Sequence, residues 1–138
     1  MARNEAPGPT HLDPSERVRA LTKRGIEQAT AGEVTAAVVS LKEAEQVALD
    51  AGLTSLAIGA HIDRGWALWL AGEAEAAATL YAEGAQMARD AGDAGRLRIA
   101  LGNLGIAYSH LGRPADALAV YEEYLPMVAD DPAETADA

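Results

Sequence analysis

The chain has 138 residues, of which 49% are hydrophobic, and its 21 acidic and 11 basic side chains give a net charge of −10 at pH 7. That length suits a single domain, and the acidic balance argues against binding to nucleic acids or anionic membranes, which need clustered lysine and arginine. The lack of cysteine excludes disulfides, thiolate metal sites and cysteine nucleophiles. No stretch approaches the roughly 20 apolar residues of a membrane span, and the start of the chain lacks the apolar segment of a secretory signal, so we expect a cytoplasmic protein.

The predicted elements are all helices, because nearly a quarter of the residues are alanine and aromatic residues make up only 4%. After a polar segment over residues 1–13, which we expect to be disordered, Asp13 is suited to cap a helix that begins at Pro14 and carries Glu16 in its first turn. A glycine suited to the left-handed conformation follows each of the first five helices. The expected ranges are 14–31, 33–51, 54–71, 73–91, 94–111 and 113–129, followed by an acidic disordered tail over residues 132–138.

The helices form a repeat with a period of 40 residues. Three pairs of glycines, seven residues apart, recur at this spacing: Gly25 and Gly32, Gly65 and Gly72, Gly105 and Gly112. An alanine recurs in the same register at Ala37, Ala77 and Ala117. A fixed period of about 20 to 50 residues is typical of a solenoid. We therefore predict an all-α solenoid of six antiparallel helices, in three units over residues 14–52, 53–92 and 93–131.

The first glycine of each pair lies in the middle of a helix, where glycine costs about 1 kcal/mol relative to alanine. The same cost at the same place in three units implies that the next helix approaches closely there. We expect Gly25, Gly65 and Gly105 to pack on the small residues of the following helix, Ala37, Ala77 and Ala117. Flexible hinges at these glycines are the alternative.

The repeated residues resemble the tetratricopeptide repeat over about residues 14–131. The third unit carries the pattern best, at Leu101, Leu104, Gly105, Tyr108, Gly112, Ala117 and Tyr121. The second unit matches at Gly65, Leu68, Gly72, Ala77 and Tyr81, and the first at Leu21, Gly25, Gly32, Ala37, Leu41 and Ala44. The unit is longer than the usual length of about 34 residues, and in this it is similar to the extended repeats of kinesin light chains. The resemblance implies a right-handed stack of three helix pairs.

The sequence departs from the family pattern at Arg24 and Arg64, which stand where the motif usually has leucine. Burying an unpaired charge is costly, so the head of each arginine must reach water or a carboxylate.

Stacked helix pairs curve, and the first helix of each pair lines the concave side. Helical spacing places one row of side chains from these helices in the resulting groove: Arg19, Lys23, Ile26, Asp63, Trp66, Leu70, Arg98, Ile99, Asn103, Ile106 and His110. Ile26, Trp66 and Ile106 would form an apolar floor. Asn103 resembles the residue with which similar repeat proteins hold a ligand's backbone, and a solvated surface position is its alternative role. Core packing is the alternative role for Trp66.

Charge divides by helix type, because the first helices of the three units sum to +4 and the second helices to −8. The acidic outer helices favour solvation, and the basic inner helices indicate a partner of acidic character. The sequence therefore predicts a non-enzymatic interaction module, an adaptor or scaffold, that binds a peptide or helix of a partner protein in its groove.

Two alternatives stay open. The chain could form a homodimer or a larger scaffold through its uncapped sixth helix, where Leu118 and Leu125 are the candidate contacts. Pro126 is expected to kink this helix or to end it early. A small-molecule or catalytic pocket could instead form around Asp63, Trp66 and His110.

No catalytic motif or metal-ligand spacing is present, so we expect no catalytic residue, metal or cofactor. The excess of arginine over lysine, 9 to 2, favours a GC-rich bacterial genome.

Overall fold

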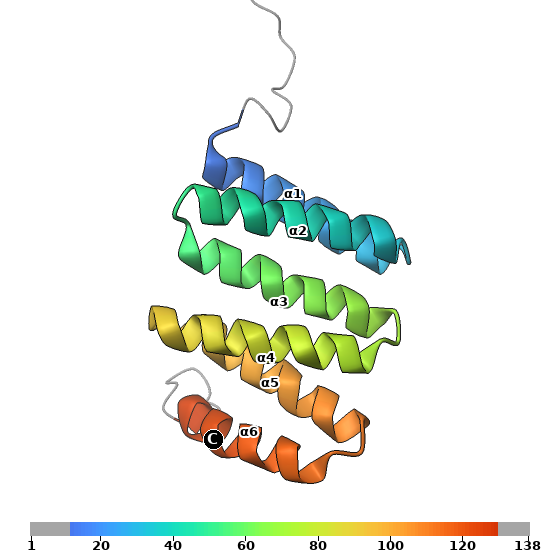
Figure 1. Cartoon of the computed structure of the whole chain (residues 1–138), viewed down its shortest axis with the longest axis vertical. Helices are drawn as coiled ribbons and strands as arrows, with labels where there is room; N and C mark the ends of the chain where they lie inside the picture. Colours follow the sequence, from blue (N-terminus) through green and yellow to red (C-terminus); the bar gives the residue numbers. More distant parts are fainter. Residues whose placement is uncertain (1–11, 130–138) are drawn as a thin grey trace, which may run out of the picture.

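The computed structural model of the chain describes residues 12–129, which form six helices and no strand (Figure 1). The helices are α1 (Pro14–Thr30), α2 (Val34–Asp50), α3 (Thr54–Leu70), α4 (Ala74–Ala91), α5 (Ala94–His110) and α6 (Pro114–Ala129). Each begins and ends within one residue of its predicted range, and the predicted all-α class is confirmed. The segments predicted to be disordered, residues 1–13 and 132–138, lie outside the described residues apart from positions 12 and 13.

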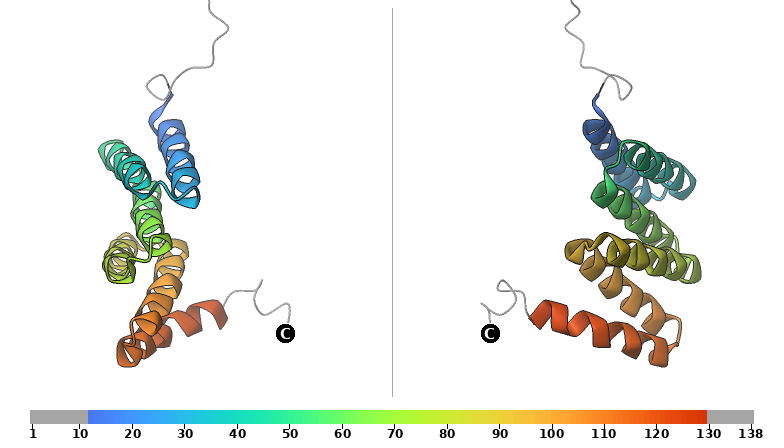
Figure 2. Two further views of the ribbon diagram at one scale, coloured as in Figure 1. Left: turned by 90° about the vertical axis from the view of Figure 1, so that its right-hand side faces the viewer. Right: turned by 60° about the vertical axis from the view of Figure 1, so that its left-hand side comes forward.

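The helices stack in chain order into a solenoid, and each packs against the next (Figure 1). Seen from the side, α2 and α4 lie on one side of the stack, and α1 and α5 lie on the other (Figure 2, left). The backbone of α3 contacts those of α1 and α5, whereas within residues 12–129 the backbones of α2, α4 and α6 do not contact one another. The odd-numbered helices are therefore closer together, as helices on the inner side of a curved stack must be. We call the side formed by α1, α3 and α5 the inner face.

Every connection between helices uses the same glycine turn. In the first, Gly32 has a φ of +83°, and the N–H of Glu33 donates to the carbonyl oxygen of Gln28 at 2.8 Å. A left-handed glycine followed by this bond closes the end of a helix and reverses the chain within a few residues. The other four connections repeat the turn at Gly52, Gly72, Gly92 and Gly112. Connections this short make consecutive helices antiparallel.

The two ends of the stack follow local sequence signals with one exception. At the start, the carboxylate of Asp13 accepts the N–H of Glu16 at 2.9 Å, and Pro14 opens the helix, as predicted. At the other end, α6 continues through Pro126 to Ala129, as its predicted range requires, so of the two expected effects of this proline the early end of the helix does not occur. Proline here leaves only the carbonyl oxygen of Glu122 without its helical partner, and Glu122 is exposed to water.

Small residues bring the helices together in the core. The fully buried alanines include Ala37, Ala44, Ala48, Ala57, Ala67, Ala77, Ala88, Ala100 and Ala107. A Cβ built on Gly25, Gly65 or Gly105 would lie only 2.6, 2.9 or 2.5 Å from Leu41, Tyr81 or Tyr121, respectively. The nearest neighbours of these glycines are thus not the expected Ala37, Ala77 and Ala117 but the larger residues one helical turn further on. An alanine is too short to fill the gap that a missing side chain leaves.

A buried histidine joins three helices. His61 on α3 is 8% exposed, its Nδ1 lies 2.8 Å from Glu45 of α2, and its Nε2 lies 3.1 Å from Glu83 of α4. Arg64 lies 3.4 Å from the other oxygen of Glu45, so this arginine does reach a carboxylate. Burial lowers the pKa of His61, but the hydrogen bonds and charges of Glu45 and Glu83 outweigh burial and the charge of Arg64. The pKa is therefore raised above its ordinary value of 6.5.

We predict that Gly65→Ala lowers the free energy of unfolding by about 1–3 kcal/mol, although alanine favours helices, because its methyl group meets the buried ring of Tyr81. Gly95→Ala is the matched control. The nearest atom to its added Cβ is Oδ1 of Asp93 at 3.7 Å, so this change should raise stability by up to about 1 kcal/mol. Urea unfolding followed by circular dichroism measures both. Equal stability of the two variants would contradict the packing role of Gly65.

The free energy of unfolding should fall as pH rises above the ordinary pKa of His61, 6.5. Because the pKa of His61 is higher in the folded protein than the ordinary 6.5, its contribution is complete below pH 6.5 and is lost as pH rises through the folded pKa. Neutral imidazole has only one N–H, so it cannot donate hydrogen bonds to Glu45 and Glu83 at the same time. Between about pH 6 and 9, the free energy of unfolding should fall more steeply for the wild type than for His61→Gln. Parallel pH profiles would show that another group is responsible.

Candidate functional site

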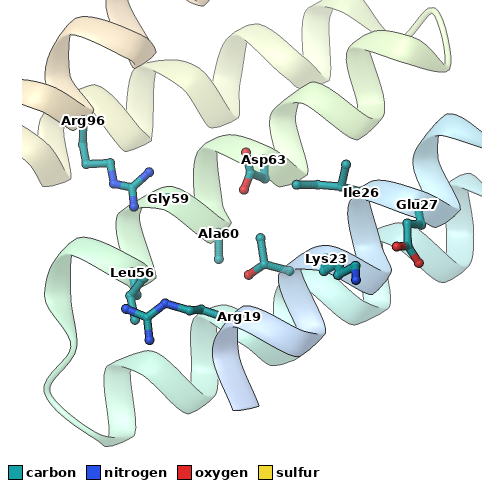
Figure 3. A pocket seen from close by; sticks show the side chains of 10 residues that line it. Arg19, Lys23, Ile26, Glu27, Leu56, Gly59, Ala60, Asp63 and Arg96 are labelled. Atoms are coloured by element: carbon teal, nitrogen blue, oxygen red, sulfur yellow. The ribbon is translucent and has the colours of Figure 1, made fainter. Parts of the chain in front are cut away.

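Two hollows open on the inner face, and both are lined by α3. The first has a volume of about 450 Å³, lies between α1 and α3, and is bordered by Arg96 of α5 (Figure 3). Four residues of the predicted groove line it: Arg19, Lys23, Ile26 and Asp63. The other lining residues are Thr22, Glu27, Leu56, Gly59, Ala60 and Arg96.

Arg96 reaches the first hollow because Gly59 leaves room for it. A Cβ built on Gly59 would lie 2.8 to 3.0 Å from atoms of the Arg96 guanidinium group, which Figure 3 shows lying next to this glycine. The Nε of Arg96 donates to Ser55 Oγ at 3.4 Å. The predicted groove does not include Arg96. Gly59 was the signal in the sequence that could have indicated Arg96, because a glycine leaves space for a neighbouring side chain. The other two units have the large residues Arg19 and Ile99 at its position.

The first hollow combines three positive charges with two carboxyl groups, those of the half-buried Asp63 and the exposed Glu27. Arg19 and Lys23 are exposed on α1, and Arg96 approaches from α5. Burial raises the pKa of Asp63, and the positive charge of Arg96 opposes this increase. The three cations can attract an anionic group of a ligand, and Asp63 can accept a hydrogen bond from a backbone N–H.

The second hollow is smaller and more aromatic. It measures about 170 Å³, lies between α3 and α5, and is lined by Trp66, Trp69, Tyr81, Asn103 and Ile106. Trp66 is half-buried and also packs against the core cluster around Ala67, so it contributes to both the core and the hollow. Ile106 is 54% exposed beside it. An exposed isoleucine next to an indole suits an apolar side chain of a ligand.

Four residues of the predicted groove line neither hollow. Leu70 and Ile99 are exposed on α3 and α5. Arg98 lines a separate depression with Met127 of α6. His110 stands at the end of α5, where its ring meets the edge of Trp69 with the ring centroids 5.2 Å apart.

The three residues of the alternative pocket, Asp63, Trp66 and His110, line three different depressions. Asp63 lines the first hollow and Trp66 the second, while His110 lines a third depression at the start of α4. His110 lies apart from the other two because it is the last residue of α5, one turn beyond Ile106, and its ring packs against that of Trp69.

Among residues 12–129, no group of three histidine, aspartate or glutamate side chains could hold a metal ion. None of the helices in this part of the chain combines the length and the apolar character that crossing a membrane requires.

Comparison with known proteins connects this architecture to one family. The family model of the tetratricopeptide repeat matches residues 56–130, more than half of the chain. Among solved structures, the crystal structure of the TPR domain of FLU from Arabidopsis is similar to 86% of this chain and 99% of that chain, with a TM-score of 0.76 and 18% sequence identity. At this identity the similarity shows the fold alone. No curated protein matches the chain.

We predict that Arg96→Gln moves the pKa of Asp63 further upward, because the substitution removes the charge that opposes the effect of burial. Gly59→Ala should have the same effect, since its methyl group displaces the guanidinium. Carbon-13 NMR of the Asp63 carboxyl group as a function of pH measures the shift, with Lys42→Gln on α2 as a control that removes a distant charge. An unchanged Asp63 pKa in Arg96→Gln would show that the guanidinium lies elsewhere in solution.

Proposed function

Because the chain belongs to the tetratricopeptide repeat family, we propose that it is a non-enzymatic adaptor or scaffold that binds a segment of a partner protein across its inner face. The proposal rests on one observation, the two hollows that α1, α3 and α5 line together with Tyr81 of α4. Asp63 of the first hollow and Trp66 of the second are one turn apart on α3. A segment that crosses the three helices can therefore contact both hollows.

The apolar contacts in this proposal come from Ile26 and Ile106, which are 37% and 54% exposed and each line one hollow. Burying a fully exposed isoleucine contributes about 1.5–3 kcal/mol. Each of these side chains is already partly covered, so its contribution is smaller. Apolar anchoring alone then gives weak binding, and polar contacts must supply the rest.

The polar contacts favour an acidic partner. Arg19, Lys23 and Arg96 line the first hollow and outnumber its two carboxyl groups, Glu27 and Asp63, although the protein as a whole carries a net charge of −10. A basic site on an acidic protein selects a complementary ligand and speeds its association. The side-chain amide of Asn103, in the second hollow, can donate to and accept from the backbone of an extended segment. This pairing does not depend on the ligand's sequence.

Selection of peptides from a random displayed library tests this function. We expect the peptides that bind to be rich in aspartate and glutamate next to an apolar residue. Arg19→Ala/Lys23→Ala should weaken their binding by about tenfold or more, measured by fluorescence anisotropy, because it removes two of the three cations at the first hollow. Ile106→Glu should weaken the same peptides through the second hollow.

Arg24→Ala/Lys42→Ala is the matched control, since it removes one arginine and one lysine from positions that line neither hollow. Its binding should equal that of the wild type, and thermal unfolding should confirm that all variants are folded. Failure to select any peptide, or equal losses in the two double variants, would refute the proposed site.

A further inference from the structure

The side of α6 that points away from the stack carries an exposed apolar face. Leu118 and Leu125 are each 60% exposed and lie seven residues apart on one side of the helix. Glu122 lies between them, and Ala115 and Ala129 lie one turn further out; all three are exposed. We call these five residues the α6 face.

The repeat identifies what covers this position in the earlier units. Forty residues before Leu118 and Leu125 stand Ala78 and Ala85, which are 3% and 1% exposed in a core cluster that also contains Leu101 and Leu104 of α5. Forty residues earlier again, the position of Leu125 is held by Glu45 of α2, which contacts His61 and Arg64 of α3. In both earlier units, the next inner helix therefore packs on this side.

We propose that the α6 face binds an amphipathic helix of a partner protein, seated as α3 is on α2 and as α5 is on α4, with a lysine or arginine opposite Glu122. The apolar side of that helix would cover the two leucines. Such a surface is separate from the inner face and from the function proposed for it.

The negative charge of Glu122 determines which kind of partner helix this face can bind. On α2, the side equivalent to the α6 face carries the carboxylate of Glu45. The helix that covers it, α3, supplies the basic groups of His61 and Arg64. Glu122 makes no ion pair with another residue among positions 12–129, and it lies between the two leucines that a docked helix would cover. Covering a carboxylate without a counterion costs free energy, so the partner must bring a positive charge.

A second copy of the chain fits this face poorly. The order Ala115, Leu118, Glu122, Leu125, Ala129 is nearly the same in both directions. Two α6 helices that pair antiparallel through this face would therefore place Glu122 against its own counterpart, and like charges in a contact are unfavourable. Residues 130–138 fit no better, because they contain only Asp, Pro, Ala, Glu and Thr and offer no large apolar side chain.

Two stapled helical peptides test the proposal. Each carries alanine, leucine, a variable residue, leucine and alanine at the spacing of the α6 face, with glutamine and alanine elsewhere, and the variable residue is lysine in one and glutamate in the other. We expect the lysine peptide to bind the wild-type protein about tenfold or more tightly than the glutamate peptide, measured by fluorescence anisotropy. Glu122→Lys in the protein should reverse this preference.

Leu118→Glu/Leu125→Glu should abolish binding of the lysine peptide, while its circular dichroism melt should stay close to that of the wild type because both leucines are 60% exposed. Arg19→Ala/Lys23→Ala should bind the lysine peptide as the wild type does, which separates this surface from the inner face. Absence of binding, equal affinity for both peptides, or binding that survives the leucine substitutions would overturn the proposal. A concentration-dependent dimer in light scattering, lost in Leu118→Glu/Leu125→Glu, would also overturn it and assign the face to a second copy.

Discussion

Neighbouring helices in this stack approach one another closely, and the rest of the structure depends on that approach. Buried alanines at equivalent positions, such as Ala37, Ala77 and Ala117, allow it along each pair of helices. A core of alanines buries little apolar area per residue, so larger side chains must fill the gaps. Leu41, Tyr81 and Tyr121 fill them opposite the mid-helix glycines, which explains why each unit contains a residue that by itself weakens a helix.

Such close packing leaves little room for polar groups in the core, and α3 carries the most connected of the few that are buried. His61 is one of only two polar residues buried among positions 12–129, and it connects α3 to glutamates on both neighbouring outer helices. On the inner face of the same helix, Asp63 and Trp66 line the two hollows. The helix that His61 ties to both neighbouring outer helices is therefore also the one that lines both hollows of the candidate site.

The two surfaces proposed to bind partners differ in charge. The first hollow is surrounded by Arg19, Lys23 and Arg96 and suits an acidic segment, whereas the α6 face has Glu122 at its centre and suits a basic helix. The difference arises from the division of charge between inner and outer helices. In the earlier units the acidic outer helices are covered by neutral or basic inner ones, and α6 is the outer helix without such a cover among the described residues. A scaffold with this arrangement can hold two partners without competition between them.

The sequence by itself determined the helices, their order and their antiparallel course. Period-40 glycines and alanines are local signals, and a left-handed glycine closes a helix whatever surrounds it, so the six ranges could be read to within one residue. It also indicated the inner row that contains Arg19, Lys23, Ile26 and Asp63. Only the tertiary structure decided which of these residues share a hollow. Arg96 joins them because Gly59, on another helix, leaves space for its guanidinium, while His110 leaves them because Trp69 offers its ring an edge contact. Such choices depend on how far one helix lies from the next, and that distance is set by contacts between side chains far apart in the sequence.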